Sequence, residues 1–365
     1  MDEKSARALL LRFFSNELAF LETEPWETLC EAAQVFGLSP LVAYKCRSRV
    51  GGANRQWCDA ALVTSWTRFS RAMGDLEHVI SVLYRAGVRA VPLKGPLLAQ
   101  RHYEPPFLRR PSTDLDVAIR DEDLEKACAS LAGCGYELGE TIRSYRATCH
   151  EAKLTHPSRM TVELHFRLSH GAFGIPTADF LDRATESYLP SGQQTWILEP
   201  ADELLHLILH LASDRFHSLF HQYELRHVWN RAPLETRREA ISRAVGYEFA
   251  GAVALADLGL RLRWNEPLLP PEITLPRTWL HARLTPELYE AMENWMEPDR
   301  KLTTRLRGRL MDLQVTDSFT AAARLAVVMA KVSAVRLGSG GWRSMPPARF
   351  GQGLEQPSAQ GREQP

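Results

Sequence analysis

The stretch PSTDLDVAI, residues 111–119, decides the fold that we expect for this chain. Two aspartates two residues apart open a short apolar run, which is typical of a buried strand. Side chains at i and i+2 of a strand point to the same face, so Asp114 and Asp116 converge. Adjacent carboxylates repel one another unless a cation lies between them, and magnesium prefers such oxygen ligands when phosphates complete its shell. The stretch therefore predicts a cation site, with a solvated turn as the alternative.

The preceding stretch VPLKGPLL, residues 91–98, suggests where a phosphate would bind. A strand that ends in Lys94-Gly95 just before a helix can bring backbone amides and a lysine to a phosphate. Gly95 lets the chain approach a ligand closely. Arg110, four residues before Asp114, adds a fixed positive charge suited to phosphate oxygens. The alternative is a plain turn between a strand and a helix.

A third carboxylate lies in TVELHFRL, residues 161–168. Alternation places Glu163, His165 and Arg167 on one face of a strand whose other face is apolar. A glutamate in a central strand is costly unless it is paired or bound to a metal. An edge strand with one solvated face is the alternative.

Changes in residue pattern and composition divide the chain into four regions. Residues 1–87 and 199–344 have apolar residues at helical spacing. Between them, residues 88–198 follow a strand–helix–strand–hairpin order, with residues 156–159 as the hairpin connection, which predicts an α+β core. Residues 345–365 are rich in proline, glycine and glutamine, and we expect a disordered tail there.

Composition excludes several classes of protein. The 365 residues hold 44 basic and 44 acidic side chains, which argues against a uniformly basic polyanion binder. Residues 300–349 nevertheless carry ten basic and two acidic residues. A solvated helix face is the simpler interpretation of this segment, and RNA binding stays open. The six cysteines form no CxxC pair. The most apolar segment, residues 318–335, is interrupted by Arg324 and Lys331. Without a secretory signal, a cytoplasmic, soluble protein is expected.

Taken together, these motifs carry a resemblance. The run LKGPLL, then Arg110 with Asp114-Leu115-Asp116, then the strand VELH resembles the uncharacterised nucleotidyltransferase family of the DNA polymerase β superfamily. The flanks LLLRFFSNELAFL, FGLSPLVAY and PADELLHLILH resemble it too, so the likeness covers about residues 5–270. It implies a polymerase β-like nucleotidyltransferase core, a mixed sheet with helices, flanked by N-terminal and C-terminal helical regions.

The resemblance also implies roles for individual residues. Asp114, Asp116 and Glu163 would be the catalytic residues and the metal ligands, holding Mg²⁺ or Mn²⁺. Lys94, Gly95 and Arg110 would bind the nucleotide. The reaction would be two-metal transfer of a nucleotidyl group from an NTP to a hydroxyl acceptor, which could be a small molecule, a protein or RNA. No membrane partner is expected.

One departure from the broader superfamily opens an alternative. The usual Gly-Ser before the paired aspartates is Lys94-Gly95-Pro96 here, so no serine hydroxyl follows the glycine, and Pro96 has no N–H to donate. A non-catalytic protein of the same fold, which binds a nucleotide or a partner, is therefore a second hypothesis.

The helical C-terminal half is rich in histidine. His206 and His210, like His217 and His221, are spaced i, i+4, which suits zinc on one helix face, although buried structural histidines are the simpler interpretation. Arg215 with His221 faintly resembles the Arg-x(4–6)-His signature of HEPN ribonucleases, which gives a weaker alternative. No GxSxG, GxGxxG or GxxxxGK[ST] motif occurs.

Overall fold

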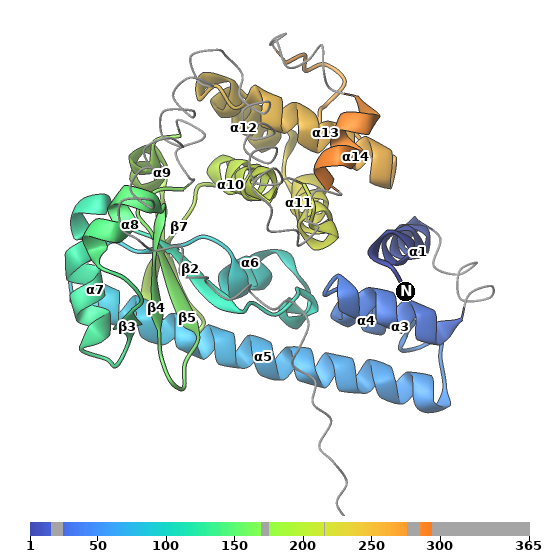
Figure 1. Ribbon diagram of the computed structural model, residues 1–365, viewed down its shortest axis with the longest axis horizontal. Coiled ribbons are helices and arrows are strands. Elements are labelled where there is room, and N and C mark those ends of the chain that lie inside the picture. The colour runs from blue at the N-terminus through green and yellow to red at the C-terminus, as the bar shows by residue number, and fades with distance from the viewer. Residues whose placement is uncertain (16–24, 169–174, 215, 276–284, 294–365) are drawn as a thin grey trace, which may run out of the picture.

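The computed structural model describes residues 1–15, 25–168, 175–214, 216–275 and 285–293 (Figure 1). Its central element is a five-stranded mixed sheet in the order β1-β2-β5-β4-β3. The strands are β1 (Val91–Pro92), β2 (Asp114–Ala118), β3 (Glu137–Leu138), β4 (Glu151–Thr155) and β5 (Thr161–His165). β2 and β5 run parallel, and the other neighbours are antiparallel. The expected α+β fold with a mixed sheet and flanking helices is confirmed.

The strand that carries Glu163 lies in the middle of this sheet. β5 pairs with β2 on one side and with β4 on the other, so the alternative of an edge strand is wrong. β4 and β5 form the expected antiparallel hairpin around residues 156–159. In that connection the His156 ring accepts hydrogen bonds from the backbone of Ser158 and Arg159, which satisfies donors that the turn would otherwise leave open.

Alternation gives the sheet one apolar and one polar face. The apolar face belongs to a core built with α5 (Gly52–Arg85) and α7 (Leu124–Ala132). The strand residues of this core are Leu115, Val117, Ala152, Leu154, Val162 and Leu164. Because this face is covered by helices, the polar side chains at the alternate positions of the same strands face the other way.

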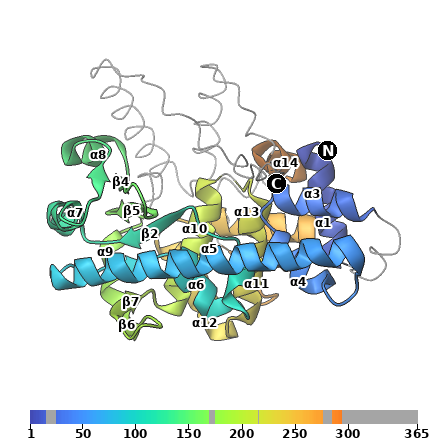
Figure 2. The ribbon, with the colours of Figure 1, turned by 90° about the horizontal axis from the view of Figure 1, so that it is seen from below.

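A second apolar core holds the helical regions together. The N-terminal region contributes α1 (Glu3–Ser15), α3 (Trp26–Val35) and α4 (Ser39–Cys46). The C-terminal region contributes α10 (Pro200–Ser213), α11 (Leu219–Arg231), α12 (Leu234–Gly246), α13 (Ala250–Trp264) and α14 (Pro286–Glu293). As Figure 2 shows, α5 runs along the molecule from the sheet to α3 and α4. Its N-terminal half thus packs with the helical core and its C-terminal half with the sheet.

Shorter elements complete the described chain. They are α6 (Gly95–His102), η1 (Pro106–Leu108), η2 (Asp121–Asp123), α8 (Ile142–Thr148), α9 (Thr177–Arg183) and the two-stranded sheet of β6 (Thr185–Tyr188) and β7 (Gln194–Ile197). The expected tail at 345–365 and the apolar segment at 318–335 lie outside the described residues. Within the described ranges, no helix has the length and apolar character needed to cross a membrane.

A buried ion pair joins the two cores. The Arg109 guanidinium donates to both carboxylate oxygens of Glu224 on α11, at 2.5 and 3.1 Å, and the two side chains are 7% and 1% exposed. Arg109 lies in the segment that leads into β2, so the pair connects the strand of the two aspartates to the C-terminal helices. Removing one member of a buried pair leaves the other charge without compensation.

We therefore expect Glu224→Gln to lower the free energy of unfolding by about 3 kcal/mol, because Arg109 stays charged in a buried place. Urea denaturation followed by circular dichroism measures the change. The matched control is Glu272→Gln, which breaks an exposed pair with Arg238 and should leave the urea midpoint unchanged. Equal midpoints for the two variants would show that the buried pair does not hold the cores together.

Candidate active site

The register of β2 and β5 brings the predicted carboxylates onto one surface. The two strands run parallel with Asp116 opposite Glu163, so both side chains leave the sheet on its polar face. Asp114 is two residues earlier on β2 and shares that face. The third strand adds Lys153 opposite Glu163 and Glu151 opposite His165. We refer to this set, from β2, β5 and β4, as the carboxylate face.

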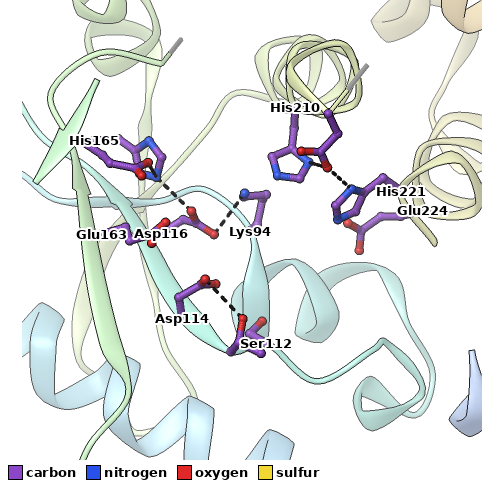
Figure 3. Close-up of polar contacts among 12 residues, drawn as sticks. Lys94, Ser112, Asp114, Asp116, Glu163, His165, His210, His221 and Glu224 are labelled. Carbon is purple, nitrogen blue, oxygen red and sulfur yellow. Dashed lines mark hydrogen bonds and ion pairs between the residues drawn. The ribbon is translucent and has the colours of Figure 1, made fainter. Parts of the chain in front are cut away.

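Asp116 is the carboxylate of this face whose negative charge is best compensated by its neighbours. Its carboxylate lies 3.2 Å from the Lys94 amine and 2.9 Å from Nε2 of His165 (Figure 3). Burial works to raise the pKa of Asp116, but Lys94 and His165 outweigh burial and hold that pKa well below its usual range. The same contact raises the pKa of His165 against the effect of its own burial. Asp116 is thus ionised although its side chain is buried from solvent.

The other carboxylates of the face are less well compensated. Burial raises the pKa of Asp114, and the negative charges of Asp116 and Glu163 raise it further. Burial likewise raises the pKa of Glu163, followed by the charges of Glu151 and Asp116, although Lys153 lies 3.2 Å away. Acidic groups that raise one another's pKa in this way gain from a cation placed among them.

The donor atoms of the face fit a metal ion. One ligand atom each from Asp116, Glu163 and His165 lies within 4.8 Å of the other two. Two carboxylate oxygens are ligands that Mg²⁺ and Mn²⁺ accept, and the imidazole shifts the preference toward Mn²⁺. Asp114 lies on the same face but is not a member of this group. His165 was not among the predicted ligands, although its place two residues after Glu163 signals a shared face.

Lys94 and Gly95 lie where β1 passes into α6. The backbone N–H of Leu93 donates to the Asp116 carbonyl at 3.0 Å, which fixes Lys94 beside the carboxylate face. Gly95 has a φ of +68°, and a Cβ added to it would lie 3.1 Å from the Ser112 hydroxyl. Sequence reasoning missed Ser112 as a site residue. Its hydroxyl nevertheless lies beside Gly95 and accepts a hydrogen bond from the Arg109 guanidinium at 3.2 Å.

The Arg110 side chain lies against α11. Its guanidinium packs 4.5 Å above the Phe220 ring and approaches Nε2 of His221 at 3.5 Å. The aliphatic part of the Arg110 side chain packs directly on Gly37. A Cβ added to Gly37 would lie 2.2 Å from Cδ of Arg110. Gly37 also has a φ of +67°. The N-terminal region therefore helps to position a predicted nucleotide-binding residue.

The contacts among the histidines of α10 and α11 differ from the i, i+4 pairs that their sequence spacing suggests. His210 packs edge-on against His221 of the other helix, with ring centroids 4.3 Å apart. Burial, helped by the positive charge of Lys94, holds the pKa of His210 well below its usual value, and burial with Arg110 does the same for His221. Burial lowers the pKa of His206 to about 3. Arg215, on which the ribonuclease alternative depends, lies outside the described residues.

Comparison with known proteins agrees with this geometry. Residues 22–256 match the family model described as uncharacterised nucleotidyltransferase. No curated protein matches the chain. The match spans well over half of the sequence and includes β1, β2, β5 and the whole carboxylate face. The chain therefore belongs to the uncharacterised nucleotidyltransferase family.

Proposed function

We propose that the protein is a metal-dependent nucleotidyltransferase that moves a nucleotidyl group from an NTP to a hydroxyl acceptor. The observation that carries the proposal is the pairing of Asp116 with Glu163 on neighbouring parallel strands, with Asp114 on the same face. In the reaction, a bond forms between the acceptor oxygen and the α-phosphorus, and the bond to the bridging oxygen breaks. Pyrophosphate leaves, and the acceptor hydroxyl loses its proton.

Asp114, Asp116 and Glu163 would hold Mg²⁺ or Mn²⁺, with His165 as a further ligand. Donor atoms of Asp116, Glu163 and His165 lie close enough together to share an ion, and Asp114 would add a carboxylate from the same face of β2. When bound, the metal would supply positive charge to the attacking and leaving oxygens. Lys94, whose amine lies 3.2 Å from the Asp116 carboxylate, would supply a positive charge for the phosphates next to the metal site.

The protein's own groups would orient the triphosphate. The Arg110 guanidinium, held over Phe220 and crossing Gly37, offers fixed N–H donors. Gly95 at the start of α6 leaves room for a phosphate next to the backbone. The Ser112 hydroxyl lies beside that glycine and can donate to the same phosphate. Little covalent chemistry is needed, because catalysis of this kind is mostly positioning and charge stabilisation.

The second candidate is a non-catalytic nucleotide-binding protein of the same fold. Two lysines already compensate the acidic face, Lys94 at Asp116 and Lys153 at Glu163, each at 3.2 Å. These two ion pairs reduce the need of the acidic face for a metal ion. This candidate requires nucleotide binding without transfer to any acceptor.

The double variant Asp114→Asn plus Asp116→Asn should lose Mg²⁺-dependent NTP turnover, by about 1,000-fold or more, because the charges that hold the metal are gone. Turnover is measured as pyrophosphate release in cell extract with α- and γ-labelled NTPs. Glu122→Gln, a change of an exposed carboxylate in η2, is the matched control and should keep full activity. A double variant as active as the parent would contradict the proposed site.

The label that reaches the acceptor shows which group is transferred. Transfer of the α-label to an acceptor indicates nucleotidyl transfer, and transfer of the γ-label indicates phosphoryl transfer. Calorimetric binding of NTP with no labelled product across varied acceptors would favour the non-catalytic protein. Circular dichroism of the double variant shows whether its loss of function comes from unfolding.

Ser112→Ala should raise KM for the NTP by about 10-fold with a smaller change in kcat, since a hydrogen bond to a charged group contributes about 1.5–3 kcal/mol. Steady-state kinetics at saturating Mg²⁺ measure both constants. Ser130→Ala removes an exposed hydroxyl of α7 and should change neither. An unaltered KM in Ser112→Ala would mean that this hydroxyl does not replace the missing serine.

A further inference from the structure

A second group of ligating side chains lies outside the carboxylate face, where α10 ends and α11 begins. Asp214 is the C-terminal cap of α10, His210 is four residues earlier, and His221 is in the first turn of α11. One ligand atom from each lies within 4.8 Å of the other two. Figure 3 shows the rings of His210 and His221 side by side, across from Lys94.

The distances in this group suit a small cation. Oδ2 of Asp214 is 2.6 Å from Nδ1 of His221 and 3.9 Å from Nδ1 of His210. A four-coordinate ion with bonds of about 2.0–2.1 Å separates its ligand atoms by about 3.3 Å. The two observed distances lie on either side of that value, so small side-chain rotations would bring all three atoms to one ion.

Hydrogen bonding does not account for the closest contact. Although Nδ1 of His221 is only 2.6 Å from the carboxylate, it has no hydrogen bond within the described part of the chain. Ligand atoms that share one metal ion lie close to one another in this way without hydrogen bonding to one another. Burial and nearby positive charge keep both rings neutral at pH 7, so their lone pairs are free to bind a metal.

We propose that His210, Asp214 and His221 form a second metal site, specific for a divalent transition metal, and that Zn²⁺ is its ion. Two imidazoles and one carboxylate are a donor set that zinc prefers and that Mg²⁺ does not. Three protein ligands leave a fourth position for water or a substrate oxygen. This site is separate from the carboxylate face and does not depend on the nucleotidyl transfer proposed above.

The test uses the full-length, chelator-treated protein and measures Zn²⁺ binding by calorimetry in millimolar Mg²⁺. We expect one zinc per chain, bound about 100-fold more weakly in His210→Gln and in His221→Gln. Co²⁺ in place of zinc should give the intense visible absorption of a four-coordinate ion, lost in the same variants. His206→Gln changes a buried histidine of α10 outside the group and should keep both signals.

His165→Gln separates this site from the carboxylate face, because His165 belongs to both other candidate groups of ligands in the described residues. Zinc binding that survives in His165→Gln and fails in His221→Gln supports the proposal. The reverse pattern, or equal affinity in all variants, overturns it. Since zinc binding is measured without nucleotide, its failure is distinguishable from a failure of nucleotidyl transfer.

Arg110 supplies an independent check. Its guanidinium faces Nε2 of His221 at 3.5 Å, and a metal on Nδ1 would require the proton to sit on Nε2, where it opposes that donor. Arg110→Gln removes this conflict and one positive charge, so zinc should bind several-fold more tightly to this variant. Weaker binding in Arg110→Gln would contradict a metal on Nδ1 of His221.

Discussion

The structure of the site depends on one constraint, the parallel pairing of β2 with β5 that sets Asp116 beside Glu163. Neighbouring carboxylates on a central strand cannot be left uncompensated. Three side chains compensate them: Lys94 from the end of β1, Lys153 from β4, and His165 from β5 itself. The opposite face of the same strands is closed by α5 and α7, so the sheet cannot relieve the repulsion by turning these residues away.

The helical regions complete the site as well as enclosing it. Because Gly37, between α3 and α4, has no side chain, the Arg110 side chain can pack against the N-terminal region there. Phe220 on α11 supports the guanidinium of Arg110 from the other side, and the neighbouring Arg109 is fixed by Glu224. A residue predicted to hold phosphate is thus set in place by segments far from it in the sequence. The family match, which includes α3 and α11 with the core, agrees with this shared construction.

The sequence predicts those features that depend on local periodicity. Alternation in TVELHFRL places Glu163 and His165 on one face, and the pair Asp114 and Asp116 follows from the same rule. The central position of β5 is not predictable in this way, because strand order depends on packing between distant segments. Ser112 beside Gly95 also depends on tertiary structure. The spacing of His206 and His210 suggests a pair within one helix, whereas contact between helices joins His210 to His221.

The 34-residue helix α5 has a consequence for the chain as a whole. It is about 50 Å long, and it supplies Cys58 to the helical core and Leu76 and Ile80 to the core behind the sheet. Each core includes residues of this helix, so α5 is a structural element that the two cores share. A fragment cut before α5 or within it would expose apolar surface on whichever half it left behind. Neither core could therefore be exchanged as a separate module without its part of α5.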